Sequence, residues 1–301
     1  MRNASALVLP GAQGRTYSHG ADHHVGTDLM TTPVSPQPLG PGADHPDLAP
    51  TTRRIRIDGY EFGVQHSPGP SAASTTSVFV IVHGIGTSHR YSAPLHRAIA
   101  VGRGTYSLDL PGFGGMSTPP HRLWVENYAT LLGTLLDTLG VTSCVIIGHS
   151  MGAEFVTELA VQRPELVSHV VLIGPVADAH RRSVVAQTVD LYRDTLKEPL
   201  SANLLVFGDY ARCGMRWYVK TLSAMLAYAT DKRIARVAAP VLVIRGSDDP
   251  IARRGWCSRL VHNSLHGRLV QIPGHRHLVH YSAPDQVADR IVEFVGVGAD
   301  R

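Results

Sequence analysis

A chain of 301 residues, of which 44% are hydrophobic and 17% are charged, has room for one large domain or two small ones with a sizeable core. The formal net charge is only +4 and the basic residues are scattered instead of forming a long run, so nucleic-acid binding is not expected. Three cysteines are too few and too widely spaced for a disulfide framework or a cysteine-based metal site.

The first 50 residues differ from the rest in composition. They carry seven prolines and six glycines without a hydrophobic period, so they cannot bury enough apolar surface to offset ordering, and we expect disorder over 1–50. Their one apolar run, Ala6–Leu9, is shorter than the ~7–15 apolar residues of a signal peptide. No stretch of the sequence approaches the ~20 apolar residues that span a membrane. We therefore expect a cytoplasmic protein without membrane association.

From residue 53 onward, short apolar runs alternate with amphipathic segments. Two runs around a glycine turn predict a hairpin, at 53–57 and 61–66. Further strands are predicted at 78–82, 105–108, 144–147, 170–173, 241–244 and 268–272, with helices at 91–100, 121–139, 253–264 and 284–294 and one directly after residue 152. This alternation is typical of a mostly parallel, doubly wound α/β sheet with helices on both faces.

The alternation breaks at residues 176–236, which are helical in composition and contain no clear strand. They follow the sixth predicted strand, at the edge of the sheet where ligands bind in such folds. We therefore predict a helical cap over 176–236, inserted into a core made of 51–175 and 237–298.

The clearest motif is Gly148-His149-Ser150-Met151-Gly152, between a predicted strand and a predicted helix. Strand, G-x-S-x-G and helix form the context of a nucleophile elbow. The serine then occupies a strained turn, and side chains two residues before or after it would collide with the strand and the helix. The helix N-terminus behind it favours negative charge. Ser150 is therefore the expected nucleophile.

Four motifs in order between residues 53 and 296 resemble the α/β-hydrolase fold family, of the cap-bearing serine esterase and C–C hydrolase branch. The four are His83–Gly86, which resembles the family's oxyanion loop, the elbow, and the acid and histidine segments below. In addition, Asp109–Ser117 resembles a structural loop of the family. The resemblance implies that the backbone N–H groups of Ile85 and Met151 form an oxyanion hole. It implies no cofactor and no metal.

The resemblance also implies the order serine, acid, histidine along the chain. After the strand at 241–244, Gly246-Ser247-Asp248-Asp249 offers two carboxylates. The family spacing resembles G-x-x-D, which selects Asp249 and leaves Asp248 as the alternative. Asp178, after the preceding strand, is a third candidate because some relatives carry the acid there.

The segment Pro273–His280 offers three histidines for the base. The family pattern resembles P-G-x-G-H-x-x-H with its first histidine catalytic, which maps onto His277. Arg276 replaces the expected glycine, so His275 stays an alternative, and His280 is expected to pack or hydrogen-bond locally. A serine needs such a base to take its proton, and the base needs a carboxylate to fix its tautomer.

We therefore expect a cofactor-free carboxylic ester hydrolase that acts on a small-molecule ester through an acyl-enzyme. The alternative is a C–C bond or lactone hydrolase with the same triad; the C–C hydrolases resemble G-N-S-M-G at the elbow, whereas this chain has His149, which favours esters. A different class is a non-catalytic ligand-binding protein on this fold. Such proteins often lose a triad member, and none is lost here.

The cap carries the clues to the substrate. Its surplus of basic residues, beside aromatic ones, suggests a pocket for an ester that carries a carboxylate, such as an aromatic-acid monoester. Arg212 and Arg216 are the candidate partners of that carboxylate because they would share one helical face, with Trp217 beside them. The other interpretation is an exposed basic lid. The sequence does not predict an oligomeric state.

Overall fold

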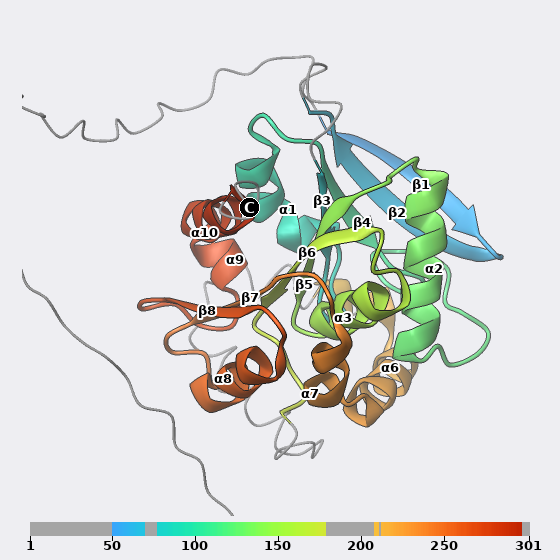
Figure 1. Ribbon diagram of the computed structural model, residues 1–301. Coiled ribbons are helices and arrows are strands. Elements are labelled where there is room, and N and C mark those ends of the chain that lie inside the picture. The colour runs from blue at the N-terminus through green and yellow to red at the C-terminus, as the bar shows by residue number, and fades with distance from the viewer. Residues whose placement is uncertain (1–49, 70–76, 179–207, 211, 297–301) are drawn as a thin grey trace, which may run out of the picture. The chain divides into compact units, whose positions relative to one another are not determined.

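The computed structural model describes residues 50–69, 77–178, 208–210 and 212–296 (Figure 1). Nearly all of the N-terminal segment that we expected to be disordered lies outside these residues. So does 179–207, the first half of the expected cap.

Within the described residues, eight strands form one sheet with the order β1-β2-β4-β3-β5-β6-β7-β8. The first two strands form the predicted hairpin, and β2 also pairs antiparallel with β4, whereas all other neighbours pair in parallel. The predicted mostly parallel α/β sheet is therefore confirmed. The strands are β1 Thr51–Ile57, β2 Tyr60–Ser67, β3 Val78–Val82, β4 Thr105–Asp109, β5 Cys144–His149, β6 Val167–Ile173, β7 Val241–Gly246 and β8 Gly267–Ile272.

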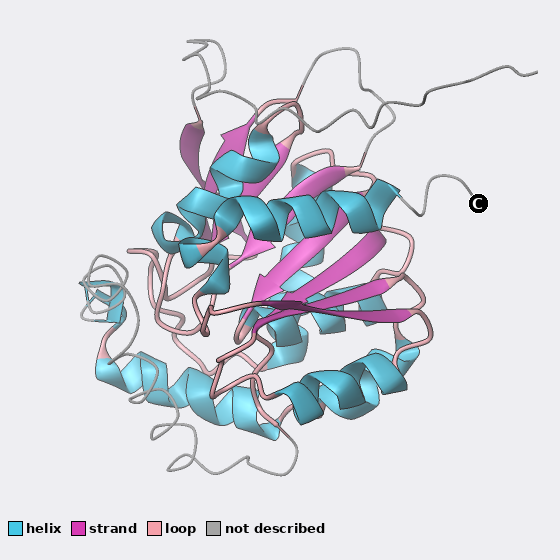
Figure 2. Cartoon of the chain, turned by 90° about the vertical axis from the view of Figure 1, so that its left-hand side faces the viewer, coloured by secondary structure: helices cyan, strands magenta, loops and turns pink. Residues whose placement is uncertain are grey.

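Helices cover both faces of the sheet (Figures 1 and 2). One face carries α1 (His89–Ala100), α9 (Val279–Ser282) and α10 (Pro284–Gly296), and the other carries α2 (Val125–Thr138), α3 (Gly152–Gln162) and α8 (Arg254–Asn263). Helices α6 (Met215–Ala227) and α7 (Thr230–Arg233) and the 3-10 turn Ile234–Arg236 lie between β6 and β7, where the helical insertion was expected. No described helix combines the length and the hydrophobicity of a bilayer span.

Alternate residues of the central strands pack on opposite faces of the sheet. In β5, Cys144 and Ile146 pack in the cluster with α2 and α3, whereas Val145 and Ile147 pack in the cluster with α1 and α10. Strands β3, β6 and β7 divide their residues in the same way. Burial on both sides explains why the sequence shows these strands as continuous apolar runs.

The end of the helical insertion is fastened to α3 through the buried carboxylate of Glu158. Arg233 donates from Nε to Oε2 at 2.7 Å and from Nη2 to Oε1 at 2.5 Å, and the Tyr228 hydroxyl donates to Oε2 at 2.9 Å. The side chain of Glu158 is 2% exposed and that of Arg233 is 27% exposed, so the pair is largely shielded from water. A buried carboxylate of this kind destabilises the fold when its cation is removed, because the charge is then left unpaired.

We expect Arg233→Met to lower the free energy of unfolding by roughly 1–3 kcal/mol, because it leaves the Glu158 carboxylate buried without its cation. The control Arg236→Met removes an exposed arginine from the same segment and should change the stability by at most ~0.5 kcal/mol. Urea denaturation measures both values. Equal losses in the two variants would contradict the anchoring role of Arg233.

Candidate active site

Ser150 lies in the turn between β5 and α3 with a φ of 55°, a left-handed conformation that costs a non-glycine residue free energy. The flanking glycines explain how this turn fits. A Cβ on Gly148 would lie 2.4 Å from the carbonyl oxygen of Gly152, and a Cβ on Gly152 would lie 2.4 Å from that of Val82. The local geometry is therefore that of the predicted elbow, with the serine side chain held at the end of the strand.

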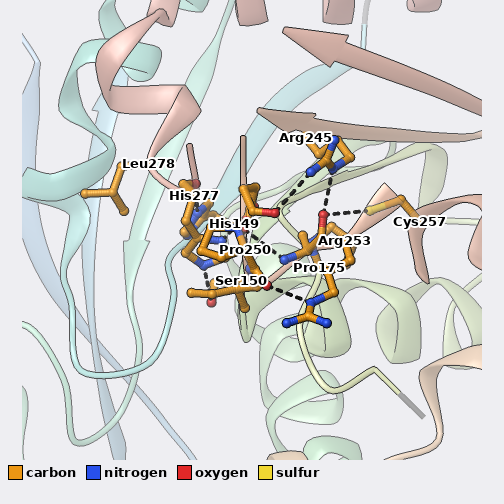
Figure 3. A network of polar contacts seen from close by, with 12 residues as sticks. His149, Ser150, Pro175, Arg245, Pro250, Arg253, Cys257, His277 and Leu278 are labelled. Atoms are coloured by element: carbon orange, nitrogen blue, oxygen red, sulfur yellow. Dashed lines mark hydrogen bonds and ion pairs between the residues drawn. The ribbon is translucent and has the colours of Figure 1, made fainter. Parts of the chain in front are cut away.

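Three side chains from separate parts of the chain form a hydrogen-bonded line at this turn. His277 Nε2 lies 3.1 Å from Ser150 Oγ, and His277 Nδ1 lies 2.9 Å from Asp249 Oδ2 (Figure 3). All three residues are buried. A carboxylate on Nδ1 places the imidazole lone pair on Nε2, which is the nitrogen that faces the serine.

Asp249 is held on its other oxygen by the backbone. Its Oδ1 accepts hydrogen bonds from the N–H groups of Ile251 at 2.8 Å and Ala252 at 2.9 Å. Burial by itself would raise the pKa of Asp249, but the adjacent His277 and these N–H donors outweigh burial and hold the pKa below its ordinary value. The acid is therefore an ionised carboxylate that orients the histidine.

The alternative acids and base are engaged elsewhere. Asp248 is exposed and accepts a hydrogen bond from Ser247 at 2.8 Å, and His275 Nδ1 pairs with Ser282 Oγ at 2.8 Å. Asp178 pairs with Arg259 at 2.5 Å. The hydrogen-bonded line to Ser150 thus contains Asp249 and His277 and none of these three.

The loop after β3 approaches the elbow closely. A Cβ on Gly84 would lie 3.1 Å from Ser150 Cβ and 3.2 Å from His149 Nδ1, so a side chain there would crowd the nucleophile and the residue before it. Ile85 and Met151 are buried, and the loop hydrogen bonds of the described residues include no acceptor for either backbone N–H. Buried N–H groups without an acceptor are rare and costly in proteins, so this pair is suited to bind an oxyanion.

Arg245, at the end of β7, supports the acid loop and was not among the residues expected from the sequence. Its buried guanidinium donates to the carbonyl oxygens of Ala252 at 2.7 Å and Asp249 at 3.0 Å (Figure 3). These carbonyls flank the turn that holds the Asp249 carboxylate. The available signal was an arginine directly after four apolar strand residues, an unusual place for a charge.

Gly174, directly after β6, is the second residue that the sequence did not reveal as part of the site. A Cβ there would lie 3.1 Å from both Cε1 and Nδ1 of His277 and 3.5 Å from Asp249 Oδ2. The glycine also has a φ of 55°. Its missing side chain therefore makes room for the hydrogen bond between histidine and acid.

The expectation that Arg212 and Arg216 share one helical face is wrong. Gly214, with a φ of 77°, precedes α6, so Arg212 lies in a separate turn before the helix. Arg212 donates to the buried carboxylate of Asp209 at 3.1 Å, whereas Arg216 is exposed. Trp217 is buried and lies against the loop after β4, where a Cβ on Gly112 would be 2.1 Å from its Nε1.

Asp209 joins the insertion to the segment that follows the oxyanion loop. Besides Arg212, its carboxylate accepts hydrogen bonds from Ser88 Oγ at 2.5 Å and Arg90 Nη2 at 2.9 Å. Tyr210 lies against Gly86, where a Cβ would be 2.4 Å from its ring. The described part of the insertion therefore contacts the loop that carries Ile85. The described ranges contain no cluster of three or more His, Cys, Asp or Glu side chains suited to a metal ion.

Comparison with known proteins identifies a family and individual related hydrolases. The profile of a family described as "Alpha/beta hydrolase family" matches residues 79–290. The (E)-2-((N-methylformamido)methylene)succinate hydrolase of Acinetobacter baylyi is 24% identical over 230 residues, which cover 69% of this chain and 86% of that protein. The 2-hydroxy-6-oxononadienedioate/2-hydroxy-6-oxononatrienedioate hydrolase of Burkholderia vietnamiensis is 27% identical over 246 residues, which cover 71% of this chain and 84% of that protein.

Solved structures share the fold. The carboxylesterase CesB (YbfK) of Bacillus subtilis superposes with a TM-score of 0.68 at 18% identity, covering 82% of this chain and 91% of that one. At such low identity the similarity supports the fold alone.

We expect Gly174→Ala to lower kcat roughly tenfold, because the new methyl group would push His277 away from Asp249 and small misplacements of catalytic groups are costly. The control Gly140→Ala introduces a side chain at a similar positive φ of 73° but with no atom within 4 Å. It should lower stability without lowering kcat. Steady-state kinetics with thermal melts separates the two effects, and a full-rate Gly174→Ala enzyme would contradict the prediction.

Proposed function

Because the chain belongs to the alpha/beta hydrolase family, we propose that it is a serine hydrolase that cleaves a carboxylic ester through an acyl-enzyme. The observation that carries this proposal is the buried line from Asp249 through His277 to Ser150, beside two N–H groups for which the described part of the chain offers no backbone acceptor. A scaffold protein would gain nothing from burying these groups in this arrangement. The proposal includes a helical cap over 176–236 that covers the site.

In the proposed mechanism, Ser150 Oγ attacks the ester carbonyl carbon while its proton passes to His277 Nε2. The negative charge on the carbonyl oxygen is stabilised by the N–H groups of Ile85 and Met151, and Asp249 stabilises the imidazolium. Collapse of the tetrahedral intermediate expels the alcohol, which takes the proton from His277. Water then attacks the acyl group with His277 as the base, and the acid leaves as Ser150 regains its proton.

We propose an ester that carries a carboxylate, because the names of two relatives describe a succinate and a dioate as substrates. Arg216 and Trp217 are the proposed substrate-binding residues. Arg212 is proposed to act through its ion pair with Asp209 instead of binding the substrate directly.

A C–C bond or lactone hydrolase is the second candidate, and the dioate hydrolase among the relatives favours it. The same serine, histidine and acid would serve both reactions, so a substrate comparison must separate them. Ester hydrolysis with no cleavage of an oxo-dienedioate would support the first candidate. The opposite result would support the second.

The proposed nucleophile can be tested with a fluorophosphonate and a panel of p-nitrophenyl esters with and without a carboxylate. We expect one covalent adduct on a peptide that contains Ser150, and loss of both labelling and turnover in Ser150→Ala. The control Ser168→Ala removes a hydroxyl that bonds to the Cys144 carbonyl at the other end of the strand, and it should behave as the wild type. Full labelling of Ser150→Ala would refute the assignment.

The acid and base can be tested against their neighbours in the sequence. Asp249→Asn and His277→Ala should each lower kcat by about 10³- to 10⁴-fold, as losses of triad members do in other hydrolases. Asp248→Asn and His275→Ala should change kcat by less than about threefold, because neither side chain touches the hydrogen-bonded line. If the mild and severe variants exchange places, the assignment is wrong.

A further inference from the structure

His149, the residue before Ser150, contacts the proposed base and lies beside the oxyanion loop. Its Nε2 lies 3.1 Å from the backbone carbonyl oxygen of His277, and its ring packs against the ring of His277 at an angle of 58°, with centroids 4.9 Å apart. Its Nδ1 lies 3.2 Å from the position of a Cβ on Gly84 in the oxyanion loop. A side chain in this place can fix the distance between nucleophile and base.

The second partner of His149 is Tyr91 of α1, on the far side of the ring. The Tyr91 hydroxyl lies 2.7 Å from Nδ1 and 3.2 Å from Nε2, so its main hydrogen bond is to Nδ1. Tyr91 is buried, and its ring also meets the rings of His149 and His280 edge to face. The hydroxyl is therefore enclosed and directed at the imidazole.

These contacts determine where the protons lie. A carbonyl oxygen only accepts, so His149 must carry its proton on Nε2 and donate it to the His277 carbonyl. Nδ1 is then a lone pair, and it accepts the hydrogen bond from the Tyr91 hydroxyl. The His277 carbonyl thus sets the tautomer, and removing the Tyr91 hydroxyl would leave the buried Nδ1 lone pair without the donor that holds this edge of the ring.

The surroundings keep His149 neutral. Burial, with His280 and His277 beside it, holds the pKa of His149 well below its ordinary value. Burial also lowers the pKa of His280 to about 3, and neither ring nitrogen of His280 has a hydrogen-bond partner among the described residues. His280 thus packs against His149 as an uncharged ring, as expected from the sequence.

We infer that Tyr91 and His149 form a positioning relay, in which the Tyr91 hydroxyl holds the ring of His149 through Nδ1 and His149 ties the backbone of the base His277 to the nucleophile turn. This inference rests on the proposed function. The relay makes no contact with substrate and acts only through His277. It therefore affects the rate of the chemical step and leaves substrate affinity unchanged.

The sharpest test removes one oxygen atom. Tyr91→Phe should lower kcat roughly 3- to 30-fold, which is the effect of losing one buried hydrogen bond in the transition state. The KM should stay within about twofold of the wild-type value. The control Tyr106→Phe removes the hydroxyl of a buried tyrosine that stacks on His66 in another part of the sheet, and it should leave both constants unchanged. A Tyr91→Phe enzyme with wild-type kcat, or with an unchanged kcat and a raised KM, would overturn the relay.

Substitutions of His149 separate positioning from packing. His149→Gln keeps a donor and an acceptor on the side chain, whereas His149→Phe keeps a ring and removes both. We expect Gln to retain more of kcat than Phe, because the hydrogen bonds and not the ring hold His277. The reverse order in variants with equal melting temperatures would show that His149 serves packing alone.

A spectroscopic measurement tests the relay without a substrate. Nitrogen-15 NMR of the wild type at neutral pH should show His149 protonated on Nε2 and not on Nδ1. Tyr91→Phe should keep this tautomer while the Nδ1 resonance shifts, because Nδ1 loses its hydrogen bond. Protonation on Nδ1 in the wild type would refute the inference even if the enzyme is active. If the wild type hydrolyses no ester but shows the Nε2–H tautomer, the proposed function fails and the relay geometry stands.

Discussion

The left-handed turn at Ser150 is the constraint on which the rest of the site depends. The strain of a serine at φ 55° is offset by a fixed frame: its N–H donates to the Ile173 carbonyl at 2.9 Å, and its carbonyl accepts from the Ala153 N–H at 3.1 Å. Glycines two residues before and after let strand and helix close around the turn. The backbone of the turn thus fixes the orientation of the serine side chain, and the base and the oxyanion loop are positioned around it.

The order of the sheet explains how they meet it. Strands β3 and β5 are neighbours although two helices and β4 separate them in the sequence, so the Gly84 loop and Ser150 emerge side by side. Continuing along the sheet, β6 leads to Gly174, β7 leads to Asp249 and β8 leads to His277. Each neighbouring strand end therefore contributes one part of the site, as expected for ligand sites at the carboxyl edge of parallel sheets.

The sequence predicted the parts that local patterns encode. The central strands are apolar runs because both faces are buried, and the elbow has a recognisable steric signature, so the sheet, the helices and Ser150 followed from the residues. The choice of Asp249 and His277 needed family resemblance, since Asp248 and His275 differ from them only in long-range contacts. Gly174 and Tyr91, the partner of His149, act on residues distant in the sequence, and no local pattern reveals them. Arg245 was visible only as a charge directly after an apolar run, which does not say what it binds. The prediction that Arg212 and Arg216 share one helical face was wrong because Gly214 separates their helical turns.

The proposed reaction path passes through a single acyl-enzyme on Ser150. The most direct test measures how the acetyl group partitions between water and added methanol for several acetate esters with different leaving alcohols. A common acetyl-Ser150 intermediate has lost its alcohol before it partitions, so the account predicts one ratio of methyl acetate to acetate for every ester. A ratio that changes with the leaving alcohol would show that water attacks the ester directly, and the account would be wrong.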